Sequence, residues 1–381
     1  MKTGSRRVPI AQRTCRAGWA FVLATGLVAA GGQPAAAEVA VLVGDPAGRV
    51  TKEPDRARMN EPFAVAFDAE GRMYGVEYTR GNRLFRVATD GAVEFVAGRF
   101  HVSNPRDAFA PDAATAAAEV RFHGLHDVAI GRDGLVYVAD TFNHRIRAFD
   151  PATRAVAVVA GTGAAGFSGD GGPAVAAAFK QAYCCSLVPA GDGLLVADIG
   201  NRRLRRVNLA RATVETLAGN GTAGRPADGA APLETPLAGP RAACMTADGT
   251  IYLALREGNA LVEIKGGTVR TVVNAAGRAG YGGDGGPGRD ALLAGPKYVS
   301  LDRAGRVLIA DTENHCIRRY DPATETITTV AGVPTKMAAG IGPDLRSTHL
   351  ARPHGCSISP DGRLVIADSD NDRILAGTIA D

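Results

Sequence analysis

The chain has 381 residues, 46% of them hydrophobic, with 43 Lys and Arg against 39 Asp and Glu and a formal net charge of +4. This near-neutral balance lacks the strongly basic surface of a protein that binds nucleic acid through its phosphates, so a nucleic-acid partner is not expected. The length allows one large core or two ordinary ones, and the fold class must come from the pattern of residues.

The first 37 residues are typical of a secretory signal peptide. Basic residues from Lys2 to Arg16 precede an apolar run at 17–30, and the small residues 35–37 follow. We expect cleavage before Glu38 and a periplasmic or secreted protein, with Arg6-Arg7 leaving both the general and the twin-arginine export routes open. No later apolar stretch is long enough to cross a bilayer, so the mature chain is expected to have no membrane span.

The cysteines do not predict a disulfide framework or a zinc knuckle. Five remain after residue 37, an odd number, and none forms a CxxC spacing. The adjacent pair would form only a strained vicinal bridge. The five are Cys184, Cys185, Cys244, Cys316 and Cys356.

A ten-residue pattern recurs along the chain. VADTFNHRIR at residues 138–147 returns as VADIGNRRLR from Val196, IADTENHCIR from Ile309 and IADSDNDRIL from Ile366. Successive landmark positions are 56 to 63 residues apart, which indicates six copies of one unit. The landmarks are Glu77, Asp140, Asp198, Leu255, Asp311 and Asp368.

Each copy predicts four antiparallel strands. In the second copy these are residues 126–130, 135–139, 145–149 and 156–161, separated by turn residues such as Asp133-Gly134. Units of this kind predict an all-β, six-bladed propeller. The expected domain is 38–381, with blades at about 61–98, 122–161, 182–219, 239–277, 295–332 and 352–381 plus 38–44.

The two ends of this domain predict how the ring closes. The sixth copy stops after its third strand, and the sequence VAVLVG at 39–44 is similar to the fourth strands of the other copies, such as VAVVAG at 156–161. We therefore expect the N-terminal strand to complete the last blade, which leaves no free sheet edge.

The repeated ADxxNxRI signature resembles the NHL repeat, and the resemblance covers residues 38–381. NHL repeats imply a six-bladed propeller, in agreement with the number of copies. The family includes RNA-binding and protein-binding propellers and the peptidylglycine amidating lyase, so the fold does not choose a function. The expected signal peptide and the near-neutral charge disfavour RNA binding.

Counting back seven residues from the turn between the first two strands gives the residue that opens each inner strand. Six such residues would surround one channel mouth: Phe63, His126, Cys185, Arg241, Lys297 and His354. In one interpretation His126 and His354, with Cys185, bind zinc or calcium, while Arg241 and Lys297 attract a carboxylate or phosphate.

The other interpretation is a hydrated channel lined by tolerated residues, because two positive side chains oppose a cation. The Pro353-His354 pair is similar to the Pro-His of the amidating lyase, but that enzyme uses three histidines and here Cys185 would have to replace one. His123 either extends such a site or is an exposed loop residue.

The Asp-x-x-Asn-x-Arg pattern itself is typical of a structural turn. Asp and Asn side chains bond nearby backbone and tolerate left-handed conformations, and a catalytic residue is not needed four times. We expect the arginines to pair with an Asp of the same or the adjacent blade. These turn residues are Asp140, Asn143, Arg145, Asp198, Asn201, Arg203, Asp311, Asn314, Asp368, Asn371 and Arg373.

Two glycine-rich loops, GFSGDGGPA at 166–174 and GYGGDGGPG at 280–288, are interpreted as shaped turns. They lack the Gly-Lys-Ser/Thr of a phosphate loop, and one Asp each is too few for an all-protein calcium site. The chain has no Gly-x-Ser-x-Gly elbow either.

The leading functional hypothesis is an exported binding scaffold that takes a protein or a small-molecule ligand on its channel-mouth face. The alternative is a metal-dependent enzyme of the lyase or lactonase kind, with its metal at the channel mouth on His126 and His354.

Overall fold

The computed structural model describes residues 39–47, 58–102 and 116–379. The expected signal peptide at 1–37 lies outside the described residues. The chain divides into the units Met1–Ala35 and Ala36–Asp381, and the second unit is the one described below.

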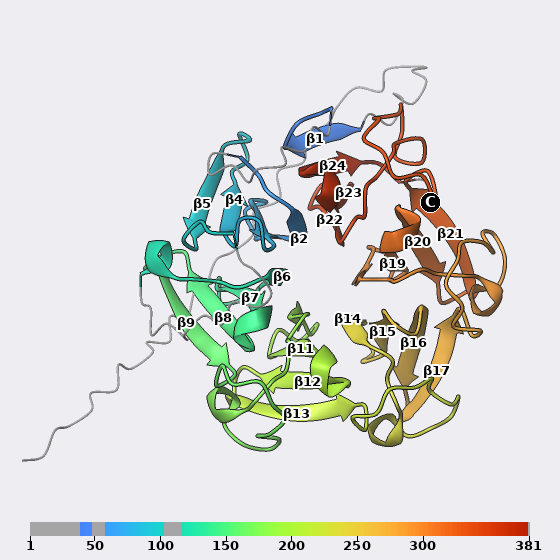
Figure 1. The fold of residues 1–381 in the computed structure, drawn as a ribbon, viewed down its shortest axis with the longest axis horizontal. Helices are drawn as coiled ribbons and strands as arrows, with labels where there is room; N and C mark the ends of the chain where they lie inside the picture. The colour runs from blue at the N-terminus through green and yellow to red at the C-terminus, as the bar shows by residue number, and fades with distance from the viewer. Residues whose placement is uncertain (1–38, 48–57, 103–115, 380–381) are drawn as a thin grey trace, which may run out of the picture. The chain divides into compact units, whose positions relative to one another are not determined.

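Six four-stranded antiparallel sheets follow one another around a centre, so the predicted all-β, six-bladed propeller is confirmed (Figure 1). The first three blades, in chain order, contain β2 (Pro62–Phe67), β3 (Met73–Glu77), β4 (Leu84–Val87) and β5 (Val93–Ala97); β6 (Leu125–Ile130), β7 (Val136–Asp140), β8 (Arg145–Asp150) and β9 (Ala155–Ala160); β10 (Ser186–Leu187), β11 (Gly193–Asp198), β12 (Arg203–Asn208) and β13 (Thr213–Ala218).

Blades 4 to 6 repeat this arrangement. They contain β14 (Pro240–Met245), β15 (Ile251–Leu255), β16 (Ala260–Lys265) and β17 (Thr268–Val273); β18 (Tyr298–Leu301), β19 (Val307–Asp311), β20 (Cys316–Asp321) and β21 (Thr326–Ala331); β22 (Gly355–Ile358), β23 (Leu364–Asp368), β24 (Arg373–Gly377) and β1 (Ala40–Val43).

Single turns of 3-10 helix complete the description. Four of them, η2, η4, η7 and η8, directly follow the second strand of blades 2, 3, 5 and 6, and each ends on a left-handed residue. The eight turns are η1 (Ala117–Glu119), η2 (Thr141–Asn143), η3 (Ala174–Ala176), η4 (Ile199–Asn201), η5 (Pro232–Glu234), η6 (Gly288–Asp290), η7 (Thr312–Asn314) and η8 (Ser369–Asn371).

The ring is closed by β1. This strand pairs antiparallel with β24, with Ala40 opposite Ala376, and so becomes the outer strand of the blade formed by the C-terminal copy. In Figure 1 the N-terminal β1 lies beside the C-terminal β24. Arg373 adds a second tie, because its Nη1 donates to the carbonyl of Pro46 over 2.9 Å.

Apolar side chains fill the space between neighbouring blades. One buried cluster joins Tyr137 and Ala148 of blade 2 to Leu194 and Val207 of blade 3, and the other clusters join blades in the same way. Both faces of a blade are therefore covered, which is why its strands show little alternation of polar and apolar residues. The cysteines among the described residues are buried thiols without a disulfide.

The two glycine-rich loops, at 166–174 and 280–288, each bond to the blade that follows them. Asp170 accepts a bond from Arg205 at 2.6 Å and from Thr216 at 2.7 Å, both in the following blade. Gly169 has a φ of +90°, and a Cβ there would lie 2.6 Å from the Cα of Ala177, so this position requires glycine. In the second loop Asp284 pairs with Arg318 at 2.6 Å in the same manner.

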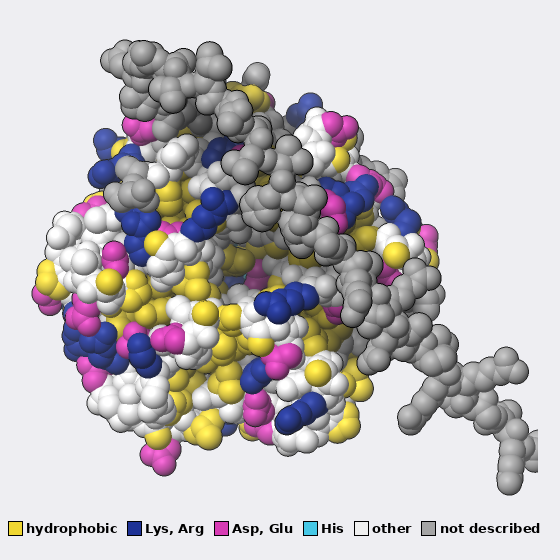
Figure 2. All heavy atoms as spheres, turned by 180° about the vertical axis from the view of Figure 1, so that it is seen from behind, with side chains coloured by type: hydrophobic (Ala, Val, Ile, Leu, Met, Phe, Trp, Pro, Cys, Tyr) yellow, Lys and Arg dark blue, Asp and Glu magenta, His cyan; other side chains and the backbone are white. Residues whose placement is uncertain are grey.

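The surface seen from behind has an uneven distribution of side chains. Figure 2 shows apolar side chains around the central hollow of this face, with most Lys, Arg, Asp and Glu side chains farther out. No helix among the described residues is long and apolar enough to span a bilayer.

Candidate functional site

We call the three residues that precede the first residue of each inner strand the approach segment. Two kinds of side chain bind its backbone by accepting N–H groups. The first is the landmark carboxylate of the same blade, which accepts the N–H that lies three residues before the opening residue. Asp140 accepts the N–H of His123 at 2.7 Å, for example. The same bond joins Glu77 to Asn60, Asp198 to Lys180, Asp311 to Ala294 and Asp368 to Ala351.

The second is a left-handed residue of the preceding blade. His144, with a φ of 55°, accepts the N–H of Gln181 on its Nδ1 at 3.0 Å. Because donor and acceptor belong to neighbouring blades, this bond ties the ring together. In the equivalent bonds the backbone N–H of Gly124 donates to Asn82, that of Gly295 to Asn259, that of Arg352 to His315 and that of Glu61 to Asp372.

The Asp and Asn of the repeat build the turn that carries these contacts. Asn143 donates to both carboxylate oxygens of Asp140 at 3.1 and 3.0 Å, and Arg147 lies 2.8 Å from the same carboxylate. The sequence does not predict the role of Arg147, and the expected partner, Arg145, donates instead to the carbonyl of Thr162.

The other copies differ in which arginine approaches the carboxylate. Arg373 pairs with Asp368 at 2.8 Å, as expected, whereas Arg203 donates to the carbonyls of Asn201 and Asn220. Arg205 and Arg318, both buried, lie 3.7 and 3.6 Å from the landmark carboxylates of their blades.

The bond to the landmark carboxylate identifies the residue that opens an inner strand, because this residue lies three positions after the bonded N–H. Five are those expected: Phe63, His126, Arg241, Lys297 and His354. In blade 3 the residue is Tyr183 and not Cys185, because the Asp198 carboxylate accepts the N–H of Lys180, three residues before Tyr183. We call Phe63, Tyr78, His126, Tyr183, Arg241, Lys297 and His354 the channel mouth.

The displacement of Cys185 has a physical cause in the turn that follows. The turn of blade 3 is closed by the bond from Gly191 to Val188, and the strand pairing resumes at Gly193, one residue later than in blade 5. Alignment on Gly193 therefore chooses a residue too far along the chain. Cys185 is buried among apolar residues of blades 2 and 3, with Sγ 3.6 Å from the carbonyl of Tyr137.

Aromatic rings form one wall of the channel mouth. Phe63 stacks on His354 at 3.9 Å and on Tyr78 at 4.4 Å between ring centroids. Tyr183 lies 4.0 Å from His126, and the guanidinium of Arg241 lies 3.9 Å from the centre of the Tyr183 ring. These flat surfaces suit a planar group on a ligand.

His126 is held in one tautomer. Its Nδ1 lies 2.8 Å from the carbonyl of Gly124 and 2.9 Å from Oγ1 of Thr141, and this hydroxyl donates to the carbonyl of Ala182. Nδ1 therefore carries the proton and Nε2 keeps its lone pair. Burial, and next the charge of Arg241, lower the pKa of His126 well below its usual range.

His354 faces a cation. The ammonium of Lys297 lies 3.2 Å from its Nε2 and 2.9 Å from the carboxylate of Glu313, which also binds Arg352. Burial lowers the pKa of Lys297 to about 8, and burial together with the Lys297 charge lowers that of His354.

These residues do not fit a metal ion. Nε2 of His354 accepts from an ammonium, Cys185 lies in the core, and within the described ranges no three His, Cys, Asp or Glu side chains form a group able to hold a metal. His123 is buried, not exposed, and its ring packs against Phe142 at 5.1 Å.

Arg241 is the most unusual residue of the channel mouth. It is only 5% exposed, and apart from the Tyr183 ring it makes no hydrogen bond or ion pair with any residue that the structure describes. Burial lowers its pKa to about 10. A buried charge without a directly paired counterion is costly, which indicates a place for an anion.

The channel is bridged just below this level. The hydroxyl of Tyr298 in blade 5 donates to Asp127 of blade 2 over 3.0 Å, and the same carboxylate accepts the N–H of Cys185 at 2.9 Å. Both residues directly follow residues of the channel mouth in the chain, Lys297 and His126. The bridge forms a floor beneath the site.

Two segments match the NHL repeat model, at residues 122–149 and 293–320. The chain is 26% identical over 252 residues to the protein SUPPRESSOR OF QUENCHING 1 of Arabidopsis thaliana, covering 64% of this chain and 24% of that protein. It is 27% identical over 286 residues to human NHL repeat-containing protein 2, covering 68% and 39%. The chain thus spans well under half the length of these relatives.

Solved structures share the fold at low sequence identity. A Bacteroides thetaiotaomicron protein of unknown function superposes with a TM-score of 0.64 at 17% identity, covering 91% of this chain and 76% of that one. An auxiliary nutrient binding protein from the same organism gives 0.61 at 13%, covering 90% and 76%, and a streptogramin B lyase 0.54 at 12%, covering 91% and 100%. The repeat matches, the NHL repeat-containing relatives and the six blades support the NHL-repeat propeller family, and the solved structures share the propeller fold.

Proposed function

We propose that this chain is an exported binding propeller, periplasmic or secreted, whose channel mouth takes a ligand with a planar anionic group. The observation that carries the proposal is Arg241, a buried guanidinium that makes no ion pair or hydrogen bond with a described residue. A carboxylate or phosphate beside it would form charge-assisted hydrogen bonds, which are about twice as strong as neutral ones.

Lys297 supports the same chemistry. Its ammonium is buried, and the positive charge of Arg241 is among the causes that lower its pKa. An anion placed near both cations would relieve their repulsion. The rings of Tyr78 and Tyr183 would cover the planar part of such a ligand.

The proposal is tested by calorimetric titration of the purified protein with benzoate, acetate and inorganic phosphate. We expect benzoate to bind more tightly than acetate, because only benzoate has a ring to stack. Arg241→Met should weaken benzoate binding by about tenfold or more, the loss of a charged hydrogen bond. Arg211→Met removes an equal charge from an exposed turn and should change nothing. Equal affinities of the two variants for every anion would refute the proposal.

A second candidate, an enzyme of the lyase or lactonase kind, is favoured by His126. A neutral imidazole whose Nδ1 is fixed and whose Nε2 makes no bond to a described residue has the form of a general base. Turnover of a lactone that disappears in His126→Gln but survives in His123→Gln would support it. A rate unchanged by His126→Gln would exclude this role.

A further inference from the structure

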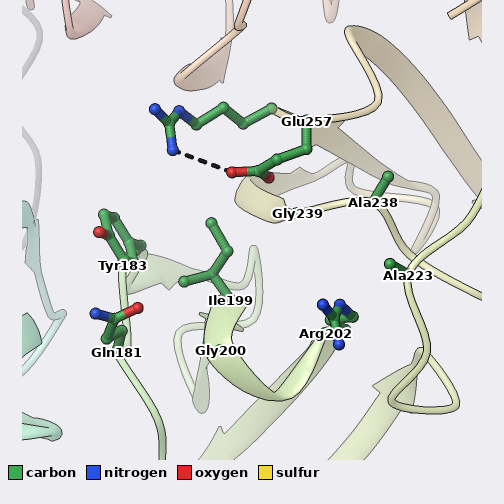
Figure 3. A pocket seen from close by; sticks show the side chains of 10 residues that line it. Gln181, Tyr183, Ile199, Gly200, Arg202, Ala223, Ala238, Gly239 and Glu257 are labelled. Carbon is green, nitrogen blue, oxygen red and sulfur yellow. Dashed lines mark hydrogen bonds and ion pairs between the residues drawn. The ribbon is translucent and has the colours of Figure 1, made fainter.

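A pocket of about 310 Å³ opens between blades 3 and 4. In the view of Figure 3, Gln181 and Tyr183 lie on one side, Arg202 and Ala223 on the other, and Glu257, which pairs with Arg256, lies at the upper edge. The nitrogen and oxygen of this pair are 3.0 Å apart. The volume is at the lower end of the range for small-molecule sites.

This junction lacks the bond that ties the other five pairs of blades. Arg202 holds the left-handed position, with a φ of 52°, that His144, Asn259 and their equivalents hold elsewhere. A guanidinium cannot accept a hydrogen bond, and the N–H of Gly239 donates instead to the carbonyl of Leu237.

The second fastening is also missing from the same approach segment. In blade 4 the landmark position is Leu255, which has no carboxylate to accept the N–H of Ala238. Ala238 and Gly239, the residues left without these acceptors, both line the pocket. The pocket therefore lies where the two hydrogen bonds found in the other blades are missing. Such local departures from a repeated pattern are typical of functional sites.

Two polar side chains of the pocket, those of Arg202 and Gln181, are available to a ligand. Neither the guanidinium of Arg202 nor the side-chain amide of Gln181 makes a hydrogen bond or an ion pair with a described residue. Arg202 is exposed on the pocket wall, so it needs no internal counterion and presents its charge to whatever enters.

Tyr183 connects this pocket to the channel mouth. The Tyr183 side chain lines the pocket, and the guanidinium of Arg241 lies 3.9 Å from the centre of its ring. Tyr183 therefore lies next to Arg241 on the channel mouth and also lines the pocket that contains Arg202.

We propose that the pocket is a second subsite of the channel mouth, and that the ligand is an elongated small molecule with an acidic group at each end. This inference rests on the proposed function. One acidic group binds at Arg241 and Lys297, and the other binds at Arg202 with the Gln181 amide beside it.

The test uses straight-chain dicarboxylates from succinate to sebacate, each compared by calorimetry with the monocarboxylate of equal length. At one chain length we expect the dicarboxylate to bind about tenfold or more tightly than its partner, because the second contact is intramolecular. Arg202→Asn should abolish this advantage and leave monocarboxylate binding within twofold.

Arg202→Asn also separates the subsite from a structural role. Asn82 and Asn259 accept from glycines at the equivalent junctions, so the introduced asparagine would supply Gly239 with the missing acceptor and raise Tm by about 1–3 °C. Arg211→Asn is the matched control and should leave the dicarboxylate advantage intact. No advantage at any length, or an advantage that persists in Arg202→Asn, would overturn the inference. If Arg241→Met still weakens monocarboxylate binding, the proposed function stands without it.

Discussion

The histidines that follow the repeat Asn act as acceptors between blades, and this role makes them sensitive to acid. His144 and His315 each accept a backbone N–H on Nδ1, which is possible only while that nitrogen is unprotonated. Burial is the largest cause that lowers the pKa of each. The sequence marked these residues as belonging to a repeat, but their partners lie 37 residues away and only the fold brings them together.

The pH dependence of stability follows from this arrangement. With folded pKa values below the unfolded value of about 6.5, the two histidines stabilise the fold above pH 6.5, and this contribution is lost as the pH falls through their folded pKa values. The variant His144→Asn/His315→Asn retains acceptors that do not titrate. We expect its Tm to fall less than that of the wild type between pH 7 and pH 5, measured by circular dichroism.

A control keeps this prediction specific. His101→Asn also removes a histidine with a lowered pKa, but one whose Nδ1 lies beside the carbonyl of Arg99 in its own loop. The Tm of this control should retain more of the wild-type pH dependence than the double variant. Identical pH profiles for the double variant and the wild type would contradict the role assigned to His144 and His315.

The candidate site was predictable at the residue scale only where the turns are regular. Counting from the turn glycine found five of the six opening residues but chose Cys185, because the longer turn around Gly191 is not visible as such in the sequence. Tyr78 was missed because its position after Glu77 has no aromatic signature in the other copies. Arg147 was not predicted because two arginines, Arg145 and Arg147, follow Asn143, and the sequence does not show which of them turns toward Asp140.

At the scale of elements, the strands were predictable and the loops were not. Turn residues at regular intervals locate every blade, because a tight turn depends on its own few residues. The path of the glycine-rich loops depends on partners in the next blade, such as the bond of Asp170 to Arg205. Their glycine-rich sequences predicted a turn but did not predict which residues of the next blade the turn would bond.

Two glycines of one loop allow a matched experiment. Gly169→Ala places a Cβ 2.6 Å from the Ala177 backbone at a φ of +90°, whereas Gly171→Ala, at +78°, meets nothing within 4 Å. The left-handed backbone alone should cost about 1–2 kcal/mol in both variants. The clash should make Gly169→Ala less stable by at least about 1 kcal/mol more in urea denaturation. Equal losses would show that this close approach does not matter.

At the scale of the whole molecule, closure was predictable because the last copy lacks a fourth strand that the N-terminal sequence supplies. The structure shows β1 paired with β24. A variant that begins at Thr51 loses this strand and the bond of Arg373 to Pro46, so β24 becomes an open edge. We expect this variant to lose the cooperative thermal transition.

The control for closure is a variant that begins at Glu38, which keeps β1 and should melt as the full-length protein does. Calorimetry of the two variants measures the contribution of β1 directly. Cooperative melting of the Thr51 variant at the temperature of its control would show that closure contributes nothing to stability.

The junction between blades 3 and 4, which lacks the bond found at the other five, has a mechanical consequence for the ring. Five seams share one kind of bond, so fluctuations that separate neighbouring blades meet the least resistance at the seam of Arg202 and Gly239. A ring cannot widen at one seam without shifting the residues around its axis, and Tyr183 and Arg241 lie on either side of this seam. We therefore expect this seam to open more readily than the other five, and an occupant that spans it to stiffen the propeller as a whole.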